Sequence, residues 1–214
     1  MKFNFLKTPS PHLIIENVFS KKIAKKMFDE ILIHKNDFTL AHTGSDIGKI
    51  NKMRNNTVLY LDNFYNDRKK SVVLTEIDKL IINEHFQEVV SSMGFPFYNL
   101  PATDISSTQI SRYGSKISQK YDWHVDSANK NRQITLVYYF LDSNSWEGGK
   151  IELSDSPILY HELIEENPKI HSIQPIPNSC MVFSSYLPHR VTPTISSDNF
   201  ELGRFSANVW IGNR

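Results

Sequence analysis

The sequence contains a single cysteine, Cys180, and no long apolar run. One cysteine excludes an internal disulfide framework and suits a reducing compartment. Its setting in Ser-Cys-Met-Val-Phe predicts a buried thiol on a strand rather than a nucleophile. The apolar runs are too short to span a membrane, and the N-terminus lacks the apolar core and cleavage site of a signal peptide. We therefore expect a cytoplasmic protein without a membrane partner.

An excess of either charge is also missing. The chain has 24 Lys+Arg against 23 Asp+Glu, a formal net charge of +1, so no overall field favours nucleic acid as a partner. The 40% of hydrophobic residues is typical of a globular protein and excludes disorder. With 214 residues, no internal repeat and no dividing linker, residues 1–214 are predicted to form one domain.

The hydrophobic pattern changes along the chain. Helical spacing predicts helices over Lys21–Lys35, with Ser20 as N-cap, and over Val72–Met93, with a strand at Thr57–Leu61 between them. From Ser107 on, short β-rich runs separated by turns are typical of a sandwich or jelly roll. These runs are Thr108–Tyr113, Tyr121–Asp126, Gln133–Leu141, Lys150–Leu153, Ile170–Gln174, Cys180–Ser184, Arg190–Thr194 and Gly203–Ile211. We expect a mainly β protein with N-terminal helices (α+β), in which residues 1–100 give helical support and a loop beside the site, and residues 105–212 form the β core.

The segment Trp123-His124-Val125-Asp126 is the first that suggests chemistry. Side chains alternate along a strand, so His124 and Asp126 project to one side. They supply two of the three groups of the 2-His-1-carboxylate arrangement that binds non-haem Fe(II). By itself the motif equally describes a surface histidine beside a solvated aspartate. A second histidine directly after a strand, His189, shifts the balance toward a metal site.

The last predicted strand has one polar and one apolar face. Alternation places Arg204, Ser206, Asn208 and Trp210 on one side, and Phe205, Ala207, Val209 and Ile211 on the other. The apolar side should be covered by the helices, so the polar side looks into a cavity. An inward arginine needs an anionic partner, because an unpaired buried charge is costly. In the absence of a matching internal acid, we expect that partner to be a ligand carboxylate.

Six segments in order resemble the 2-oxoglutarate/Fe(II)-dependent dioxygenases, most closely the prolyl 4-hydroxylase-like branch. They lie between Ile105 and Trp210, about half the chain, and are Gln109–Gly114, His124-x-Asp126, Arg132–Tyr139, Trp146–Ile151, Pro188–Pro193 and Gly203-Arg204-x-Ser206 with Trp210. The resemblance implies a double-stranded β-helix (jelly roll, cupin-like) with helices packed on the outer face of one sheet.

The resemblance also implies residue roles and cofactors. Fe(II) would be bound by His124, Asp126 and His189, and 2-oxoglutarate by Arg204, Tyr139, Tyr113 and Ser206. O2 is the second cosubstrate, and dependence on ascorbate is typical of the family. The implied reaction is hydroxylation of an unactivated C–H bond with release of succinate and CO2. Related halogenases have a small residue at the position of Asp126, so a carboxylate there favours hydroxylation, or demethylation or desaturation through the same intermediate, over halogenation.

The substrate stays open between a free amino acid, another small metabolite and a prolyl residue in a peptide. The loop Thr39–Asn56 is expected to border the cavity mouth, where His42, Lys49, Lys52 and Arg54 form a basic cluster for an acidic substrate or merely a solvated loop. We place Arg54, Gln109, Asn208 and Trp210 in the substrate pocket. A second loop, Ser154–Lys169, is predicted to be a lid or a short surface helix.

Several alternatives remain. The stretch Thr194–Glu201 between His189 and Arg204 is predicted to be an inserted polar turn, which leaves Arg190 as a second candidate for the carboxylate clamp. A cupin-like metal or ligand-binding module without oxygenase activity would need no such clamp. Nucleic-acid demethylases of the superfamily have a further arginine where this chain has Trp210. We expect a monomer or a homodimer.

Overall fold

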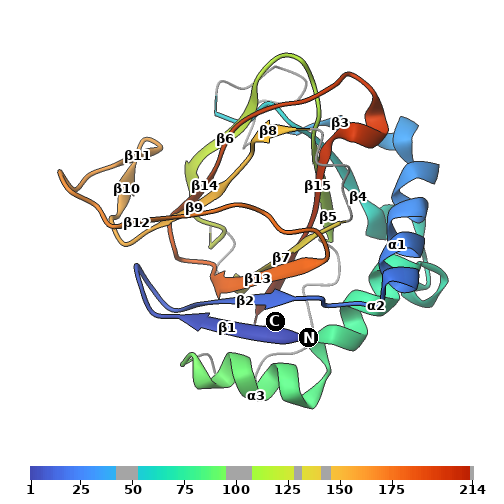
Figure 1. Cartoon of the computed structure of the whole chain (residues 1–214), viewed down its shortest axis with the longest axis horizontal. Helices are drawn as coiled ribbons and strands as arrows, with labels where there is room; N and C mark the ends of the chain where they lie inside the picture. The colour runs from blue at the N-terminus through green and yellow to red at the C-terminus, as the bar shows by residue number, and fades with distance from the viewer. Residues whose placement is uncertain (42–52, 95–107, 128–131, 141–145, 213–214) are drawn as a thin grey trace.

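The computed structural model describes residues 1–41, 53–94, 108–127, 132–140 and 146–212. Its two main sheets are antiparallel, and successive strands alternate between them from β5 to β7 and from β13 to β15 (Figure 1). This alternation is the jelly-roll arrangement. The larger sheet has the order β1-β2-β13-β7-β15-β5-β4-β3, and the smaller has β12-β9-β14-β6, with β8 also paired to β14.

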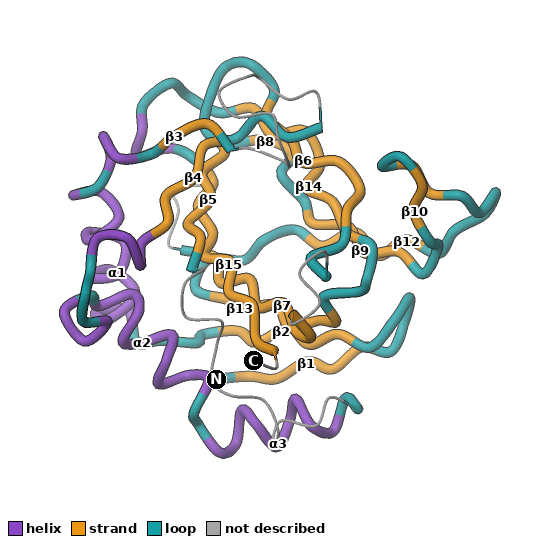
Figure 2. The backbone as a smooth tube through the Cα atoms, turned by 180° about the vertical axis from the view of Figure 1, so that it is seen from behind, coloured by secondary structure: helices purple, strands orange, loops and turns teal. Residues whose placement is uncertain are grey.

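All eight strands predicted after Ser107 are present, with ends that differ by a few residues. They are β5 (Gln109–Tyr113), β6 (Gln119–His124), β7 (Arg132–Tyr139), β9 (Ile151–Ser154), β12 (Ile170–Ile173), β13 (Ser179–Ser184), β14 (His189–Ile195) and β15 (Arg204–Gly212). The short strand β8 (Glu147–Gly148) and a hairpin of β10 (Ile158–Leu159) and β11 (Glu162–Leu163) were not predicted. Figure 2 shows the hairpin standing beside β12, at the edge of the smaller sheet.

Three helices flank the larger sheet: α1 (Lys21–Ile33), α2 (Val72–Ile81) and α3 (Glu84–Ser92). Ser20 caps α1 as predicted, since its side chain accepts a hydrogen bond from the Ile23 amide. The single helix predicted over Val72–Met93 is wrong, because Asn83 accepts from the Phe86 amide and starts a new helix. No helix in the described ranges is long and apolar enough to cross a membrane.

The description of residues 1–100 as helical support also needs correction. Four strands from this part, β1 (Lys2–Leu6), β2 (His12–Glu16), β3 (Thr39–Leu40) and β4 (Thr57–Tyr60), extend the larger sheet at both edges. Leu13 and Ile15 of β2 are fully buried under the helices. Their alternation covers only five residues, so the strand gave no clear periodic signal.

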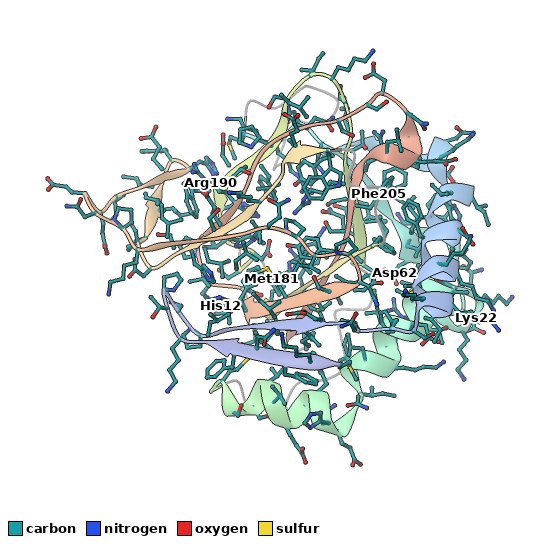
Figure 3. All side chains as sticks on the ribbon, in the orientation of Figure 1. His12, Lys22, Asp62, Met181, Arg190 and Phe205 are labelled. Atoms are coloured by element: carbon teal, nitrogen blue, oxygen red, sulfur yellow. The ribbon has the colours of Figure 1, made fainter. Side chains whose placement is uncertain are left out.

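The two faces of β15 divide as predicted. Phe205, Ala207, Val209 and Ile211 are buried in one core cluster with helix residues such as Met27 and Leu74. Figure 3 shows Phe205 on the side of β15 toward α1. Cys180 lies fully buried on β13, as expected, and burial raises the pKa of its thiol well above the usual range. The opposite face of β15 is therefore free to line a cavity.

The predicted inserted turn has an exposed tip at Asp198 and Asn199, and its end is anchored to the core. A short 3-10 helix, Phe200–Leu202, ends it, and the Phe200 ring packs edge-on against Phe205. The buried Arg112 donates to the carbonyl oxygens of Phe200 (3.0 Å), Gly114 (2.7 Å) and Asn199 (3.2 Å). Arg112 thus fixes the segment that leads directly into Arg204.

Replacing Arg112 with methionine should lower the free energy of unfolding by about 2–3 kcal/mol, because carbonyl oxygens near the core lose their charged donor. Urea denaturation measures this change. The matched control is Lys116→Met in the same region, where the lysine is exposed and pairs with Asp198, and it should change stability by less than about 0.5 kcal/mol. Equal effects of both substitutions would contradict the anchoring role.

A histidine pair connects the two sheets. Nδ1 of His12 in β2 lies 2.8 Å from the Ser10 carbonyl oxygen, so this nitrogen carries the proton. Nε2 of His12 then accepts from Nδ1 of His171 in β12 at 2.9 Å. Burial, followed by the neighbouring His171, lowers the pKa of His12, although the hydrogen bond to Ser10 opposes this shift.

This lowered pKa predicts a loss of stability in acid. Below about pH 6.5, the unfolded chain binds a proton at His12 that the folded chain does not, so the free energy of unfolding falls as the pH decreases. A His12→Gln variant should lose less stability between pH 7 and pH 5.5 than the parent chain, measured by urea denaturation. The exposed His85→Gln control should behave as the parent. An unchanged pH slope in His12→Gln would contradict this assignment.

Candidate functional site

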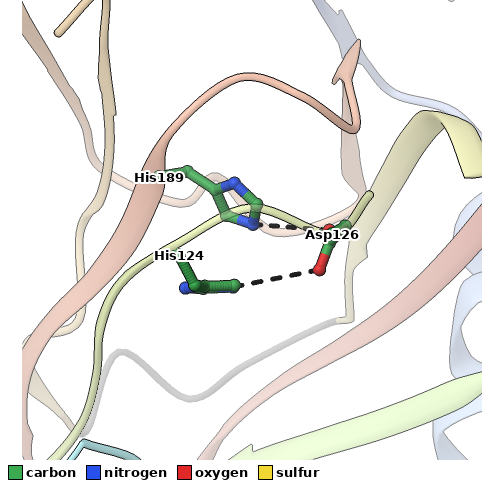
Figure 4. A group of neighbouring side chains, drawn as sticks. All are labelled: His124, Asp126 and His189. Atoms are coloured by element: carbon green, nitrogen blue, oxygen red, sulfur yellow. Dashed lines mark ion pairs between the residues drawn. The ribbon is translucent and has the colours of Figure 1, made fainter. Parts of the chain in front are cut away.

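Strand pairing brings His124 and His189 together. His124 ends β6, His189 begins β14, and the two residues are register partners in the antiparallel pair. Asp126 follows β6, where its amide donates to the Ser185 carbonyl oxygen at 2.9 Å. An Asp126 carboxylate oxygen lies 3.4 Å from His189 Nε2, and the other lies 3.9 Å from His124 Nε2 (Figure 4). One ligand atom from each residue lies within 4.8 Å of the others, so the group can share one metal ion.

The hydrogen bonds of both histidines leave the inner nitrogens free. Nδ1 of His124 donates to the Asp122 carbonyl oxygen, and Nδ1 of His189 donates to the Leu187 carbonyl oxygen, each at 2.8 Å. A neutral imidazole with a protonated Nδ1 presents the lone pair of Nε2. Burial, followed by the charge of His189, lowers the pKa of His124 well below its usual value. The neutral form that binds a metal is therefore favoured at His124.

Asp126 is held as a carboxylate. Burial by itself would raise its pKa, but the facing His189 holds the pKa of the Asp126 carboxyl far below its usual range. The Thr135 hydroxyl, on β7, donates to the carboxylate at 2.8 Å. Thr135 also lies 3.0 Å from the Ser185 hydroxyl. Together these contacts fix the orientation of the carboxylate beside the histidines.

A bulge in β6 adds an aromatic ring to the group. Between the paired positions, β6 runs three residues from Tyr121 to His124 while β14 runs only two from His189 to Val191. The extra residue turns Tyr121 to the same side as His124. Their rings stack with centroids 3.5 Å apart, so Tyr121 covers one face of the imidazole.

The metal-ligand group lies in a cavity of about 480 Å³. The lining includes these predicted site residues: His124, Asp126, His189, Arg204, Tyr113, Ser206, Arg54, Gln109, Asn208 and Trp210. Tyr139 is the exception: it lies behind the wall, with its ring centroid 5.2 Å from the Arg204 guanidinium carbon. The predicted direct contact of Tyr139 with a ligand therefore becomes support of Arg204.

Arg204 is almost completely buried, with 2% of its surface exposed. Its Nε donates to the Gly149 carbonyl oxygen at 2.8 Å, and the ring of Tyr113 lies 5.0 Å from the guanidinium carbon. Nη1 has no hydrogen-bond partner in the described part of the chain. A buried cationic donor without a partner fits a ligand carboxylate.

The alternative clamp, Arg190, does not reach the cavity. Its Nε donates to the Glu152 carboxylate at 2.7 Å, and its guanidinium stacks on Trp123. Figure 3 shows Arg190 on β14, away from β15. The inserted turn therefore leaves Arg204 in the predicted place.

Sequence reasoning missed several lining residues. Tyr121 depends on the bulge, and Arg132 stacks on Trp210, with its guanidinium carbon 3.8 Å from the ring centroid. The segment Ser154–Lys169 contains the β10–β11 hairpin, so the predicted short helix is wrong, while the lid stays a prediction. His161, at the turn of the hairpin, lines the cavity. Of the predicted basic cluster, His42, Lys49 and Lys52 lie outside the described residues.

Comparison with known proteins relates this geometry to a family. The sequence model of the 2OG-Fe(II) oxygenase superfamily matches residues 108–212, about half the chain. The chain belongs to this superfamily. The chain is 26% identical over 209 residues to an uncharacterised PKHD-type hydroxylase of Synechocystis sp., an alignment that covers 95% of the chain and 63% of the relative. The chain thus spans less than two thirds of that relative.

Solved structures share its fold. One is a prolyl hydroxylase from Trichoplax adhaerens in complex with a peptide fragment of the hypoxia-inducible factor oxygen degradation domain. The comparison has a TM-score of 0.66 and 16% identity, and it covers 94% of the present chain and 83% of that structure. Another is a Pseudomonas putida prolyl-4-hydroxylase, with a TM-score of 0.57, 13% identity and coverage of 95% and 92%. The predicted double-stranded β-helix and the resemblance to the prolyl 4-hydroxylase-like branch are confirmed. The His-Asp-His group and the free donor of Arg204 fit the Fe(II) and 2-oxoglutarate that give the superfamily its name.

Replacing Thr135 with valine should raise the Kd for Mn(II), a stable substitute for Fe(II), by about 10- to 100-fold. The carboxylate of Asp126 loses the hydroxyl that orients it, while side-chain volume is nearly kept. Electron paramagnetic resonance titration measures free Mn(II). Thr57→Val on β4 is the control, because that hydroxyl points to a backbone carbonyl oxygen. The positioning role is wrong if both variants bind Mn(II) as tightly as the parent chain.

Proposed function

We propose that the chain is an Fe(II)- and 2-oxoglutarate-dependent dioxygenase that hydroxylates an unactivated C–H bond of an amino acid, a small metabolite or a peptidyl prolyl residue. One observation carries the proposal: the unpartnered Nη1 of the buried Arg204 belongs to the same cavity as the His124, Asp126 and His189 ligand group. A cupin-like binding module has no need for a buried cation at that place.

Each residue of the chain has a defined part in this proposal. His124, Asp126 and His189 would hold Fe(II). Arg204 binds the distal carboxylate of 2-oxoglutarate, with Ser206 beside it and Tyr113 lining the pocket. When bound, Fe(II) and 2-oxoglutarate supply the oxidation of the substrate by O2, with succinate and CO2 as coproducts.

The arrangement of the ligands supports hydroxylation over halogenation. Asp126 occupies the carboxylate position and is fixed by Thr135, so no halide position is opened by a smaller residue there. The cavity is walled by both sheets, which limits the access of water to the reacting groups.

Anaerobic addition of Fe(II) and 2-oxoglutarate to the metal-free chain tests this function. We expect the weak visible charge-transfer band of a chelated 2-oxoacid, with a Kd for 2-oxoglutarate that rises by about 30-fold or more in Arg204→Gln, because one partner of a buried charge pair is removed. Arg190→Gln is the matched control on the outer side of β14 and should leave the band unchanged.

The other outcomes are equally informative. Iron binding without a band in the parent chain would overturn the clamp and favour a cupin-like module. Failure to bind Fe(II) at all would overturn the ligand group. Thermal unfolding of each variant, together with Arg204→Lys as a variant that keeps the charge, separates loss of binding from loss of fold.

A further inference from the structure

Arg54 is a second buried arginine in the cavity, with 7% of its surface exposed. Backbone pairing holds it beside β6, since Arg54 forms a bridge with Tyr121 and the Asp122 amide donates to the Met53 carbonyl oxygen at 2.8 Å. Its guanidinium carbon lies 4.5 Å from the centroid of the Tyr121 ring, and that ring stacks on His124. The Tyr121 ring therefore lies between the guanidinium of Arg54 and the predicted metal ligand His124.

The hydrogen-bond partners of Arg54 are all neutral. Its Nε donates to the Asn56 side chain at 2.8 Å, and its Nη2 donates to Oε1 of Gln109 at 2.6 Å, with the Ser111 hydroxyl at 3.4 Å. No ion pair to Arg54 and no hydrogen bond from its Nη1 occur among the residues that the structure describes. These neutral contacts orient the guanidinium but leave its charge uncompensated.

Two other arginines of the chain have positive charges that neighbouring groups compensate. Arg68 is half-buried and paired with both Asp62 and Asp78. Arg112 is buried against three carbonyl oxygens outside the cavity. Arg54 differs from both, because it has neither an acid nor a full set of carbonyl acceptors and it faces the cavity. A buried charge without compensation is costly, so its retention in a ligand cavity points to an anionic ligand.

The cavity as a whole has an excess of positive charge. Its described lining contains three arginines, Arg54, Arg132 and Arg204, against one carboxylate, Asp126. Under the proposed function, Asp126 belongs to the metal and Arg204 to 2-oxoglutarate. The charges of Arg54 and Arg132 are then left, and the guanidinium of Arg132 stacks on Trp210.

We propose that Arg54, oriented by Gln109 and Asn56, binds a carboxylate of the substrate, so that the substrate is a small carboxylic acid such as a free amino acid rather than an uncharged internal residue of a peptide. This inference rests on the proposed function and selects among its substrate classes. The cavity volume of about 480 Å³ suits a small molecule.

The test uses trifluoroacetate as the carboxylate probe. Its 19F nuclear magnetic resonance signal is measured in the presence of the chain loaded with Zn(II) and saturating 2-oxoglutarate. We expect saturable broadening of the signal with the parent chain and with Arg190→Gln, and a Kd at least about tenfold higher with Arg54→Gln. Neutral trifluoroethanol should show no saturable broadening with any variant.

A second variant protects the test against misfolding of Arg54→Gln. In Gln109→Glu, Arg54 stays in place but gains an internal carboxylate at the atom it already contacts, so probe binding should fall by a similar factor in a chain with unchanged thermal unfolding. Equal Kd values for the parent chain, Arg54→Gln and Gln109→Glu would overturn the inference, as would a parent chain that binds no probe.

The same samples distinguish this inference from the proposed function. The anaerobic Fe(II) and 2-oxoglutarate band should form equally in the parent chain and in Arg54→Gln, because Arg204 is unchanged. Absence of the band in the parent chain contradicts the oxygenase function. Probe binding that depends on Arg54 in the metal-free chain would then still establish the carboxylate subsite.

Discussion

The antiparallel pairing of β6 with β14 is the constraint on which the site depends. It places His189 directly opposite His124, although the two residues are far apart in the chain. The bulge in the same pair turns Tyr121 onto His124, and the backbone bridge from Tyr121 to Arg54 places a cation beside that ring. A shift of this register by one residue would turn every side chain of the shifted strand to the opposite face and separate the metal ligands.

The second organising feature is the division of β15 into two faces. Its apolar face is buried with the helices in one core cluster, so the strand is fixed from outside. Its polar face carries Arg204, Ser206 and Trp210 into the cavity. Arg112 holds the segment in front of this strand by donating to three carbonyl oxygens. The position of the buried Arg204 charge thus results from packing on the opposite side of the sheet.

Compensation of charge explains why this cavity is suited to small anions. A guanidinium that is taken out of water requires acceptors of comparable strength. Outside the cavity, aspartates and carbonyl oxygens serve Arg68 and Arg112. Inside it, Arg204 and Arg54 keep donors for molecules that the chain does not supply. The cavity therefore combines a metal-ligand group of low net charge with three cationic side chains, Arg54, Arg132 and Arg204.

The sequence alone determined the parts that depend on local order. Strand alternation predicted the shared side of His124 and Asp126 and both faces of β15, and turn spacing predicted the strands after Ser107, because these signals repeat within a few residues. Tertiary structure decided the rest. The single helix over Val72–Met93 was wrong because one capping residue, Asn83, outweighed a continuous apolar stripe. The strand β2 was missed because five residues carry too little periodicity. The position of Tyr121 depends on a bulge between two paired strands. Tyr139 lies behind the cavity wall because of how the side chains around it pack. The charge of Arg54 is uncompensated because no acidic side chain of the described residues pairs with it. Such relations arise only when distant segments pair, so no local pattern contains them.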